Sequence, residues 1–320
     1  MRRTKFAALA AGAVAALTLS ACGSGTGAGA GEKPYIAIVS KGFQHQFWQA
    51  VKQGAEQAAD RLGARITFVG PPTEQDVEEQ INMLTNALAK SPDALGFAAL
   101  DSRAAAPLLK QAQAEGIPVI AFDSGVDSDI PVTTVATDNK AAAAAAAKHM
   151  AELLGGEGTV AMVVHDQTSK SGTDRRDGFI QWMKKNAPGI KILPPQYGGG
   201  DQLTSANITK SFLAANPGLD GIFASNEGSA IGVINGVQES GAKDVTVVGF
   251  DSGKAQIQAI KNGLMAGAIT QNPIGMGEKL VESAMKAING KQLPKTIDTG
   301  FYWYDKTNLN DPKIKKVLYK

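Results

Sequence analysis

From Tyr35 onward, short apolar segments alternate with longer amphipathic ones, and this alternation is the strongest constraint on the fold. Most apolar segments are rich in Val, Ile and Phe without a polar residue at every second position, which is typical of parallel strands buried on both faces. They cover residues 35–39, 66–69, 94–100, 119–122, 132–136, 159–164, 190–193, 221–224, 245–250 and 266–270. Between them, helices are predicted at 46–62, 75–90, 102–115, 139–154, 173–187, 202–215, 228–240, 254–262 and 274–290. This order predicts an α/β protein with doubly wound, mostly parallel sheets.

An internal similarity predicts two lobes that are built alike. Residues 117–125 (IPVIAFDSG) and 245–253 (VTVVGFDSG) both end a buried strand with Phe-Asp-Ser-Gly. Each half thus places an aspartate, Asp123 or Asp251, at the carboxyl end of a strand, where doubly wound sheets bind their ligands. If the lobes face each other, one carboxylate enters the cleft from each side. A turn or helix-cap role is the alternative for both aspartates.

Length and charge narrow the possible functions. The 320 residues suffice for two lobes of roughly 120–150 residues each. The formal charge of +2 includes three basic residues and no acidic one before residue 22, so the remainder of the chain carries −1. A nucleic-acid-binding protein needs a basic surface, and this chain lacks the charge for one. The single cysteine excludes internal disulfides and cysteine-built metal centres, and we expect neither metal nor cofactor.

The first 33 residues have the pattern of a targeting signal followed by a tether. Arg2, Arg3 and Lys5 precede an apolar stretch over residues 6–17, which is short for a membrane span, so residues 1–21 are predicted to be a signal peptide. Residues 19–22 (LSAC) resemble the bacterial lipobox, whose cysteine becomes lipidated; an ordinary secretory signal is the alternative. Residues 22–33 are rich in glycine and are predicted to form the lipidated Cys22 and a flexible tether. No strand precedes these glycines, which argues against a dinucleotide-binding motif.

Several short motifs of the remaining chain occur in an order and at a spacing that are typical of one protein family. They lie at residues 37–40, 47–48, 116–123, 135–139, 175–179, 222–226, 248–251 and 269–271. In these motifs the chain resembles the type I periplasmic binding proteins of sugar ABC transporters, the ribose/galactose-binding family, over nearly all of residues 34–300. The resemblance implies two Rossmann-like lobes joined by three crossings near residues 138, 271 and 298. The N-terminal lobe would comprise residues 34–138 and 272–298, and the C-terminal lobe residues 139–271 and 299–320.

The resemblance also implies a function. The cleft would close on a monosaccharide or related polyol, and the loaded protein would dock on an ABC permease in the membrane. We expect a monomer, held outside the cytoplasm by its lipid anchor, as in Gram-positive bacteria. A nucleoside or signal molecule is the alternative ligand, and a chemosensory receptor the alternative partner. We expect no enzymatic activity, since the sequence has no nucleophile elbow, Walker loop or His-Glu-x-x-His motif; glycoside cleavage by the paired aspartates is the alternative.

Matched position by position, the resemblance implies eight ligand-binding residues. They are His45, Phe47, Trp48, Asp123, Arg175, Asn226, Asp251 and Gln271. The aromatic pair would pack against the sugar ring, and the charged and amide side chains would bind its hydroxyl groups. Structural roles are the alternatives: core packing for an aromatic, an ion pair with Asp177 for the arginine, a helix cap for the asparagine and a hinge role for the glutamine. Of the other histidines, His149 is predicted to lie on a helix surface and His165 at a strand end near the cleft.

Three positions depart from the ribose-binding pattern. Ser124 stands where ribose-type members have an arginine, and Ala98 where they have an asparagine. Gly200 replaces a second-lobe aromatic, so that stacking contact is missing unless Tyr197 supplies it. These departures argue against ribose itself and favour a different pentose, a hexose, a polyol or a modified sugar.

Overall fold

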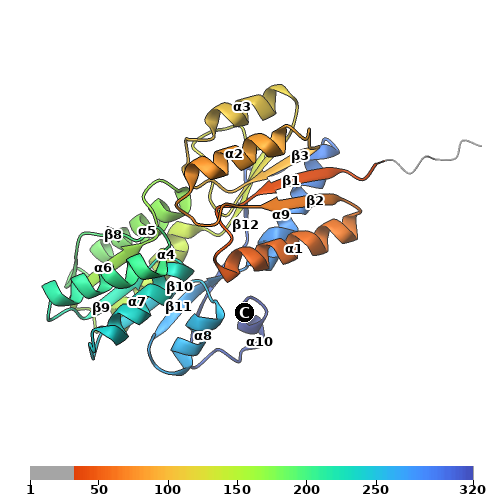
Figure 1. The fold of residues 1–320 in the computed structure, drawn as a ribbon. Coiled ribbons are helices and arrows are strands. Elements are labelled where there is room, and N and C mark those ends of the chain that lie inside the picture. Colours follow the sequence, from red (N-terminus) through yellow and green to blue (C-terminus); the bar gives the residue numbers. More distant parts are fainter. Residues whose placement is uncertain (1–31, 320) are drawn as a thin grey trace, which may run out of the picture. The chain divides into compact units, whose positions relative to one another are not determined.

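Two sheets with helices on both faces make up the fold (Figure 1). The computed structural model describes residues 32–319, so the predicted signal peptide, Cys22 and nearly all of the tether lie outside it. The first sheet is entirely parallel and contains, in spatial order, β12 (Thr296–Asp298), β5 (Thr133–Ala136), β4 (Val119–Phe122), β3 (Ala94–Phe97), β1 (Tyr35–Val39) and β2 (Arg65–Val69).

The second sheet repeats this plan with one antiparallel edge. Its order is β13 (Phe301–Asp305), β11 (Gly267–Gln271), β10 (Thr246–Phe250), β9 (Gly221–Ala224), β6 (Gly158–Val164) and β7 (Ile190–Ile192), with the short β8 (Gln196–Tyr197) also paired to β6. Only β13 runs antiparallel, against β11. The predicted α/β class with two doubly wound lobes is confirmed, and every predicted strand is present.

Helices cover both sheets and lie close to the predicted ranges. The first lobe carries α1 (Gln46–Leu62), α2 (Val77–Leu88), α3 (Ala106–Ala114) and α9 (Pro273–Ile288). The second carries α4 (Asn139–Leu153), α5 (Lys170–Asn186), α6 (Gln202–Ala215), α7 (Glu227–Glu239), α8 (Lys254–Lys261) and the short α10 (Pro312–Lys315). Helix α5 begins three residues earlier than predicted because the Ser169 hydroxyl accepts a hydrogen bond from the Gly172 amide and caps the helix there.

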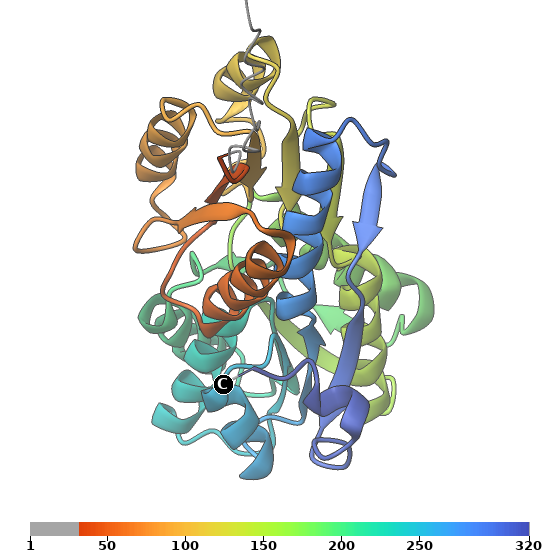
Figure 2. The same ribbon diagram turned by 90° about the vertical axis from the view of Figure 1, so that its right-hand side faces the viewer.

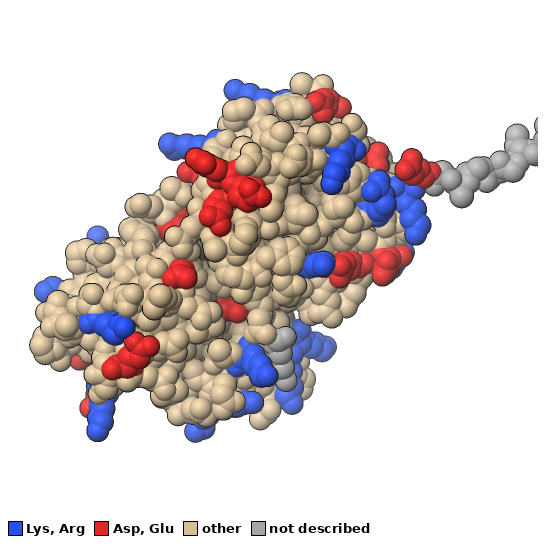
Figure 3. All heavy atoms as spheres, in the orientation of Figure 1, with Lys and Arg blue, Asp and Glu red and all other residues tan. Residues whose placement is uncertain are grey.

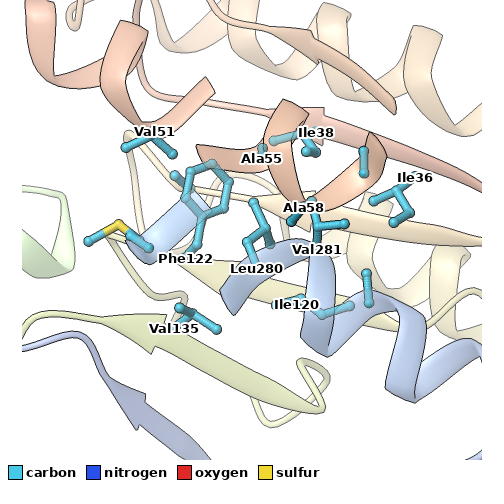
Figure 4. Close-up of a cluster of buried hydrophobic side chains, with 14 of the residues drawn as sticks. Ile36, Ile38, Val51, Ala55, Ala58, Ile120, Phe122, Val135, Leu280 and Val281 are labelled. Carbon is cyan, nitrogen blue, oxygen red and sulfur yellow. The ribbon is translucent and has the colours of Figure 1, made fainter. Parts of the chain in front are cut away.

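The core of the first lobe forms between its sheet and the helices α1 and α9. Figure 4 shows aliphatic side chains of β1 and β4 facing those of both helices, with the Phe122 ring beside them. The two helices lie side by side (Figure 2) and approach closely, because glycines face the partner backbone. A Cβ at Gly54 would overlap the carbonyl oxygen of Ile274, and one at Gly277 would overlap that of Val51.

The chain passes between the lobes three times. It crosses after β5, after β11 and between β12 and β13, so α9 and β12 belong to the first lobe although they follow the second in sequence. The end of the chain touches both lobes: the Tyr319 ring lies 6.1 Å from that of Phe47, and its hydroxyl accepts a hydrogen bond of 3.1 Å from the Ser252 amide. This contact with the first lobe was not predicted, since residues 299–320 were expected in the second.

Two further properties concern the described residues as a set. Among residues 32–319, none of the helices is both long and apolar enough to cross a bilayer. The face shown in Figure 3 carries both acidic and basic side chains and has no continuous basic surface.

Candidate ligand-binding site

A buried cavity lies where the carboxyl ends of strands from both lobes meet. Its volume is about 20 Å³, which is room for about one water molecule. Its lining consists of Lys41, His45, Phe47, Trp48, Glu74 and Asp123 from the first lobe, and His165, Ser171, Arg175, Asn226, Asp251 and Gln271 from the second. The structure thus places all eight residues selected from the sequence around one cavity.

The two Phe-Asp-Ser-Gly segments form equivalent turns on opposite sides of this cavity. Asp123 and Asp251 both adopt left-handed backbone conformations, with φ of 55° and 76°. Each amide still bonds to the neighbouring strand, Asp123 to the carbonyl of Val135 and Asp251 to that of Ile269. Non-glycine residues rarely adopt this conformation, and such strain concentrates at functional sites. The duplication seen in sequence is therefore a duplication of backbone geometry.

Asp123 presents a carboxylate that no other described residue uses. Its side chain is 4% exposed, and within residues 32–319 it accepts no hydrogen bond. Burial raises the pKa of this carboxyl to about 6, although the nearby charges of Lys41 and Arg175 oppose the shift. An unpartnered, desolvated carboxylate gains from any hydroxyl donor that enters the cavity.

Asp251 and Arg175 are held more firmly by the second lobe. The Asp251 carboxylate accepts hydrogen bonds from Gln271 Nε2 at 2.7 Å and from the Glu227 amide at 3.0 Å. Burial raises its pKa, and the Arg175 charge opposes that shift. The Arg175 guanidinium stacks 3.8 Å from the Phe250 ring centroid. It also donates to Asn139 and to the backbone carbonyl of Ser225, which fixes its plane at the cavity wall.

Two polar side chains at the cavity have atoms without partners among the described residues. Neither ring nitrogen of His45 has a hydrogen-bond partner there, and neither does Oε1 of Gln271. The two side chains are only 3% and 1% exposed. Buried polar groups in folded proteins are normally paired, so these atoms mark places where a ligand supplies the partner.

The remaining predicted residues combine structural and cavity-lining positions. Phe47 and Trp48 pack edge to face with ring centroids 4.9 Å apart, and both belong to the core of the first lobe as well as to the cavity wall. Asn226 caps α7, since its Oδ1 accepts from the Ser229 amide, while its Nδ2 donates to Glu74 at 3.3 Å. These residues therefore have the structural roles that were considered as alternatives, and they also line the cavity.

Three charged or ionisable lining residues were not selected from the sequence. Lys41 follows β1, Glu74 follows β2, and His165 follows β6. For His165, the sequence analysis predicted a position near the cleft but no part in the site. All lie beyond the carboxyl ends of parallel strands, so the rule that singled out the two aspartates would have found them had it been applied to every strand. Burial lowers the pKa of His165 to about 3, which keeps its ring neutral.

Lys41 crosses from the first lobe to the second. Its ammonium lies 3.4 Å from Asp166 Oδ2 and within 3.4 Å of the Ser169 and Ser171 hydroxyls. Burial favours the neutral amine, but the surrounding carboxylates, Asp166 foremost, outweigh it and raise the lysine pKa. The cation is thus already neutralised by the protein.

A second contact between the lobes consists of reciprocal helix caps. The Glu227 carboxylate of the second lobe accepts hydrogen bonds from the amides of Gln46 and Phe47 at 3.0 and 3.1 Å, at the start of α1. In return, Oε1 of Gln46 accepts from the Lys254 amide at 2.7 Å, at the start of α8. These amides are among those that a helix leaves unpaired, so each lobe completes a helix of the other.

Two of the departures from the ribose pattern, Gly200 and Ser124, have identifiable contacts in the structure. Gly200 has φ of 67°, and a Cβ there would lie 3.0 Å from Asn226 Nδ2 and 3.1 Å from Glu74 Oε2. The suggestion that Tyr197 replaces the missing aromatic is wrong, because Tyr197 does not line the cavity and instead accepts a hydrogen bond from Arg176. Ser124 accepts a hydrogen bond from the Ser171 amide and so contacts the opposite lobe.

His149 differs from its predicted surface position. It is half-buried, and its ring stacks on Trp303 with centroids 4.0 Å apart. The reason is that β13, which was not predicted, passes beside α4. Within residues 32–319, no group of three or more His, Cys, Asp or Glu side chains is arranged to hold a metal ion.

Comparison with known proteins agrees with this geometry. The profile of the periplasmic binding protein domain matches residues 36–292. The chain belongs to the periplasmic binding protein family. Among curated relatives, the ribose import binding protein of Escherichia coli is 28% identical over 261 residues, 82% of this chain and 87% of that protein. The D-allose-binding periplasmic protein of the same organism is 29% identical over 270 residues, 81% of this chain and 86% of that protein.

Solved structures of family members are also similar. A solute-binding protein from Agrobacterium vitis with bound D-fucose is 35% identical, with a TM-score of 0.86 over 89% of this chain and 100% of that one. A second protein from the same organism, bound to α-D-tagatopyranose, is 32% identical, with a TM-score of 0.87 over 90% of this chain and 100% of that one. Its place in this family makes the chain an extracytoplasmic solute-binding protein of the type I fold and not an enzyme.

Proposed function

We propose that this periplasmic binding protein captures a neutral monosaccharide or related polyol between its lobes and delivers it to the permease of an ABC importer. The observation that carries the proposal is the set of buried, unpartnered atoms on His45 and Gln271, which face one cavity from both lobes with the Asp123 carboxylate in the same lining. A ring of hydroxyl groups can donate to the carboxylate and amide oxygens and can both donate to and accept from a histidine ring.

The charges of the cavity favour a neutral ligand. Its two strong cations, Lys41 and Arg175, already bind protein acceptors, whereas three carboxylates, Glu74, Asp123 and Asp251, face the same space. A sugar phosphate or sugar acid would meet this surplus of negative charge without a free cation.

The mechanism is closure around the ligand. Ligand groups contact both lobes only when the hinge is closed, so the sugar binds that arrangement more tightly than an open one. The interlobe bonds of Lys41 and Glu227 form in the same arrangement. The permease would recognise the closed surface.

The proposal extends to the residues outside the described structure. The lipobox resemblance supports lipidation at Cys22 after removal of residues 1–21, with a glycine-rich tether up to residue 33 and an anchor of the Gram-positive type. The crossings support lobe boundaries near residues 138, 271 and 298. We also propose that the protein acts as a monomer, since one chain supplies both walls of the cavity.

A thermal-shift screen tests the ligand class. Residues 33–320 form one compact unit and serve as the sample. A sugar present at 100 times its dissociation constant should stabilise the protein by about 2.7 kcal/mol. The panel comprises D-fucose, D-tagatose, D-arabinose, D-allose, polyols and nucleosides. Stabilisation by nucleosides alone, or by no sugar or polyol, would contradict the proposal.

A further inference from the structure

One corner of the cavity has a composition that the ribose-type pattern does not explain. Glu74, on the loop between β2 and α2, is 8% exposed and lines the cavity. Its Oε1 accepts a hydrogen bond of 2.7 Å from Trp48 Nε1, and its Oε2 lies 3.3 Å from Asn226 Nδ2 and 3.9 Å from His45 Nε2. The carboxylate therefore reaches the second lobe while remaining at the cavity wall.

Gly200 makes room for this corner. Any side chain at that position would meet Asn226, Glu74 and His45, at 3.0 to 3.4 Å from its first carbon. An aromatic ring from the second lobe is thus replaced by a carboxylate and an imidazole from the first. The wall changes from a surface that packs against C–H groups to one that binds hydroxyl groups.

The hydrogen bonds of this corner are incomplete within the described residues. Each carboxylate oxygen of Glu74 has a single donor, although it has two lone pairs. Both nitrogens of the neighbouring His45 ring are buried and have no partner among residues 32–319. The corner therefore lacks at least one group that donates to the carboxylate or imidazole and one that accepts from the ring.

We propose that Glu74 is a specificity-determining residue, whose carboxylate binds, together with His45, one hydroxyl group of the sugar in the corner left open by Gly200. This inference rests on the proposed function and adds a selection rule to it: the ligand carries a hydroxyl at that corner, and the analogue without it is rejected. Sites built to bind a hydroxyl discriminate strongly against its absence, because their buried polar groups are then left unpaired.

The experiment compares a sugar with its deoxy analogues in two variants. Calorimetry on residues 33–320 first identifies the tightest ligand among D-fucose, D-tagatose, D-arabinose and D-allose, and then measures each monodeoxy analogue of it. The wild type should lose at least 100-fold in affinity for one analogue. Glu74→Gln, which keeps an acceptor for Trp48, should bind the parent sugar 10- to 100-fold more weakly than the wild type does. In this variant, the difference in affinity between the parent sugar and that same analogue should shrink to less than tenfold.

Controls separate this role from a structural one. Glu79→Gln removes an exposed carboxylate of α2 and should leave both affinities unchanged. Thermal unfolding without sugar shows whether Glu74→Gln is folded. If it is not, Glu74→Asp keeps the charge but withdraws it by one methylene, and it should weaken binding of the parent sugar at least tenfold.

The outcomes distinguish the two proposals. If the wild type binds no sugar of the panel, the proposed function fails, and the selection rule fails with it. If the wild type binds a sugar but a folded Glu74 variant keeps the full affinity and the full loss for every deoxy analogue, the role of Glu74 is overturned and the proposed function stands. A loss of affinity that is equal for the parent and all analogues also overturns it, since a residue that only supports Trp48 would give that result.

Discussion

Replacing Asp123 by asparagine should weaken sugar binding and at the same time stabilise the ligand-free protein. The carboxylate is buried without a hydrogen-bond partner among the described residues, and burial raises its pKa from 3.8 to about 6. The ionised form is therefore unfavourable in the empty cavity and becomes favourable when sugar hydroxyls donate to it. Asparagine imitates the protonated form and tolerates the left-handed backbone of this position.

The magnitudes follow from this shift. The pKa of Asp123 is higher in the folded protein than in the unfolded chain. The contribution of this residue to the free energy of unfolding is therefore fully present below pH 3.8 and is lost as the pH rises through about 6. A shift of about two units corresponds to roughly 3 kcal/mol at neutral pH, which Asp123→Asn should recover. Binding has the opposite dependence, because the sugar lowers the pKa of the carboxylate it contacts. Affinity is full above pH 6 and should fall about tenfold by pH 5.

Calorimetry and thermal unfolding between pH 5 and 8 measure both effects. Asp123→Asn should bind at least about 30-fold more weakly at pH 7.5, about 2 kcal/mol, and should lose most of the pH dependence of binding. Asp129→Asn, an exposed substitution nearby, serves as the control. A wild-type affinity that stays constant from pH 7 to pH 5, or an asparagine variant that melts below the wild type at pH 7.5, would refute this reasoning.

Two further predictions concern the lobes and the core. Glu227→Ala removes the acceptor for the Gln46 and Phe47 amides across the cleft. Sugar affinity should therefore fall about 3- to 30-fold, by the same factor for every sugar. Calorimetry with two sugars measures this, and a change in selectivity between them would contradict it. Gly54→Ala forces a methyl group against the Ile274 carbonyl between α1 and α9. The free energy of unfolding, measured by urea titration, should fall by about 1–3 kcal/mol. A stability equal to that of the wild type would disprove the close contact.

The strands were predictable from the sequence because burial on both faces leaves an unambiguous pattern. Among the elements that were missed, β12 and β13 lack that pattern, because they are short or partly exposed and their pairing depends on distant parts of the chain. The Phe301–Asp305 strand has an edge position, and nothing local to it shows that it returns to β11. Its absence from the prediction also explains why the stacking of His149 on Trp303 was unforeseen.

The site was predictable to the extent that a family pattern covers it. The eight residues chosen from that pattern lie around one cavity, and their part in ligand binding stays a prediction. Lys41 and Glu74 follow strands as the two aspartates do, but a charged residue in a loop is usually exposed, and only the folded sheet shows that both are buried. The same limit applies to Gly200, whose role depends on Glu74 and His45 approaching it from the other lobe.

The position of Tyr319 affects how this protein is best handled in the laboratory. The ring packs beside Phe47 of one lobe, and the hydroxyl accepts a hydrogen bond from the Ser252 amide of the other. An affinity tag or fluorescent partner fused directly after Tyr319 would start at this contact between the lobes. Purification handles are better placed ahead of residue 33, whereas a dye at the carboxyl end would make a direct optical reporter of ligand capture.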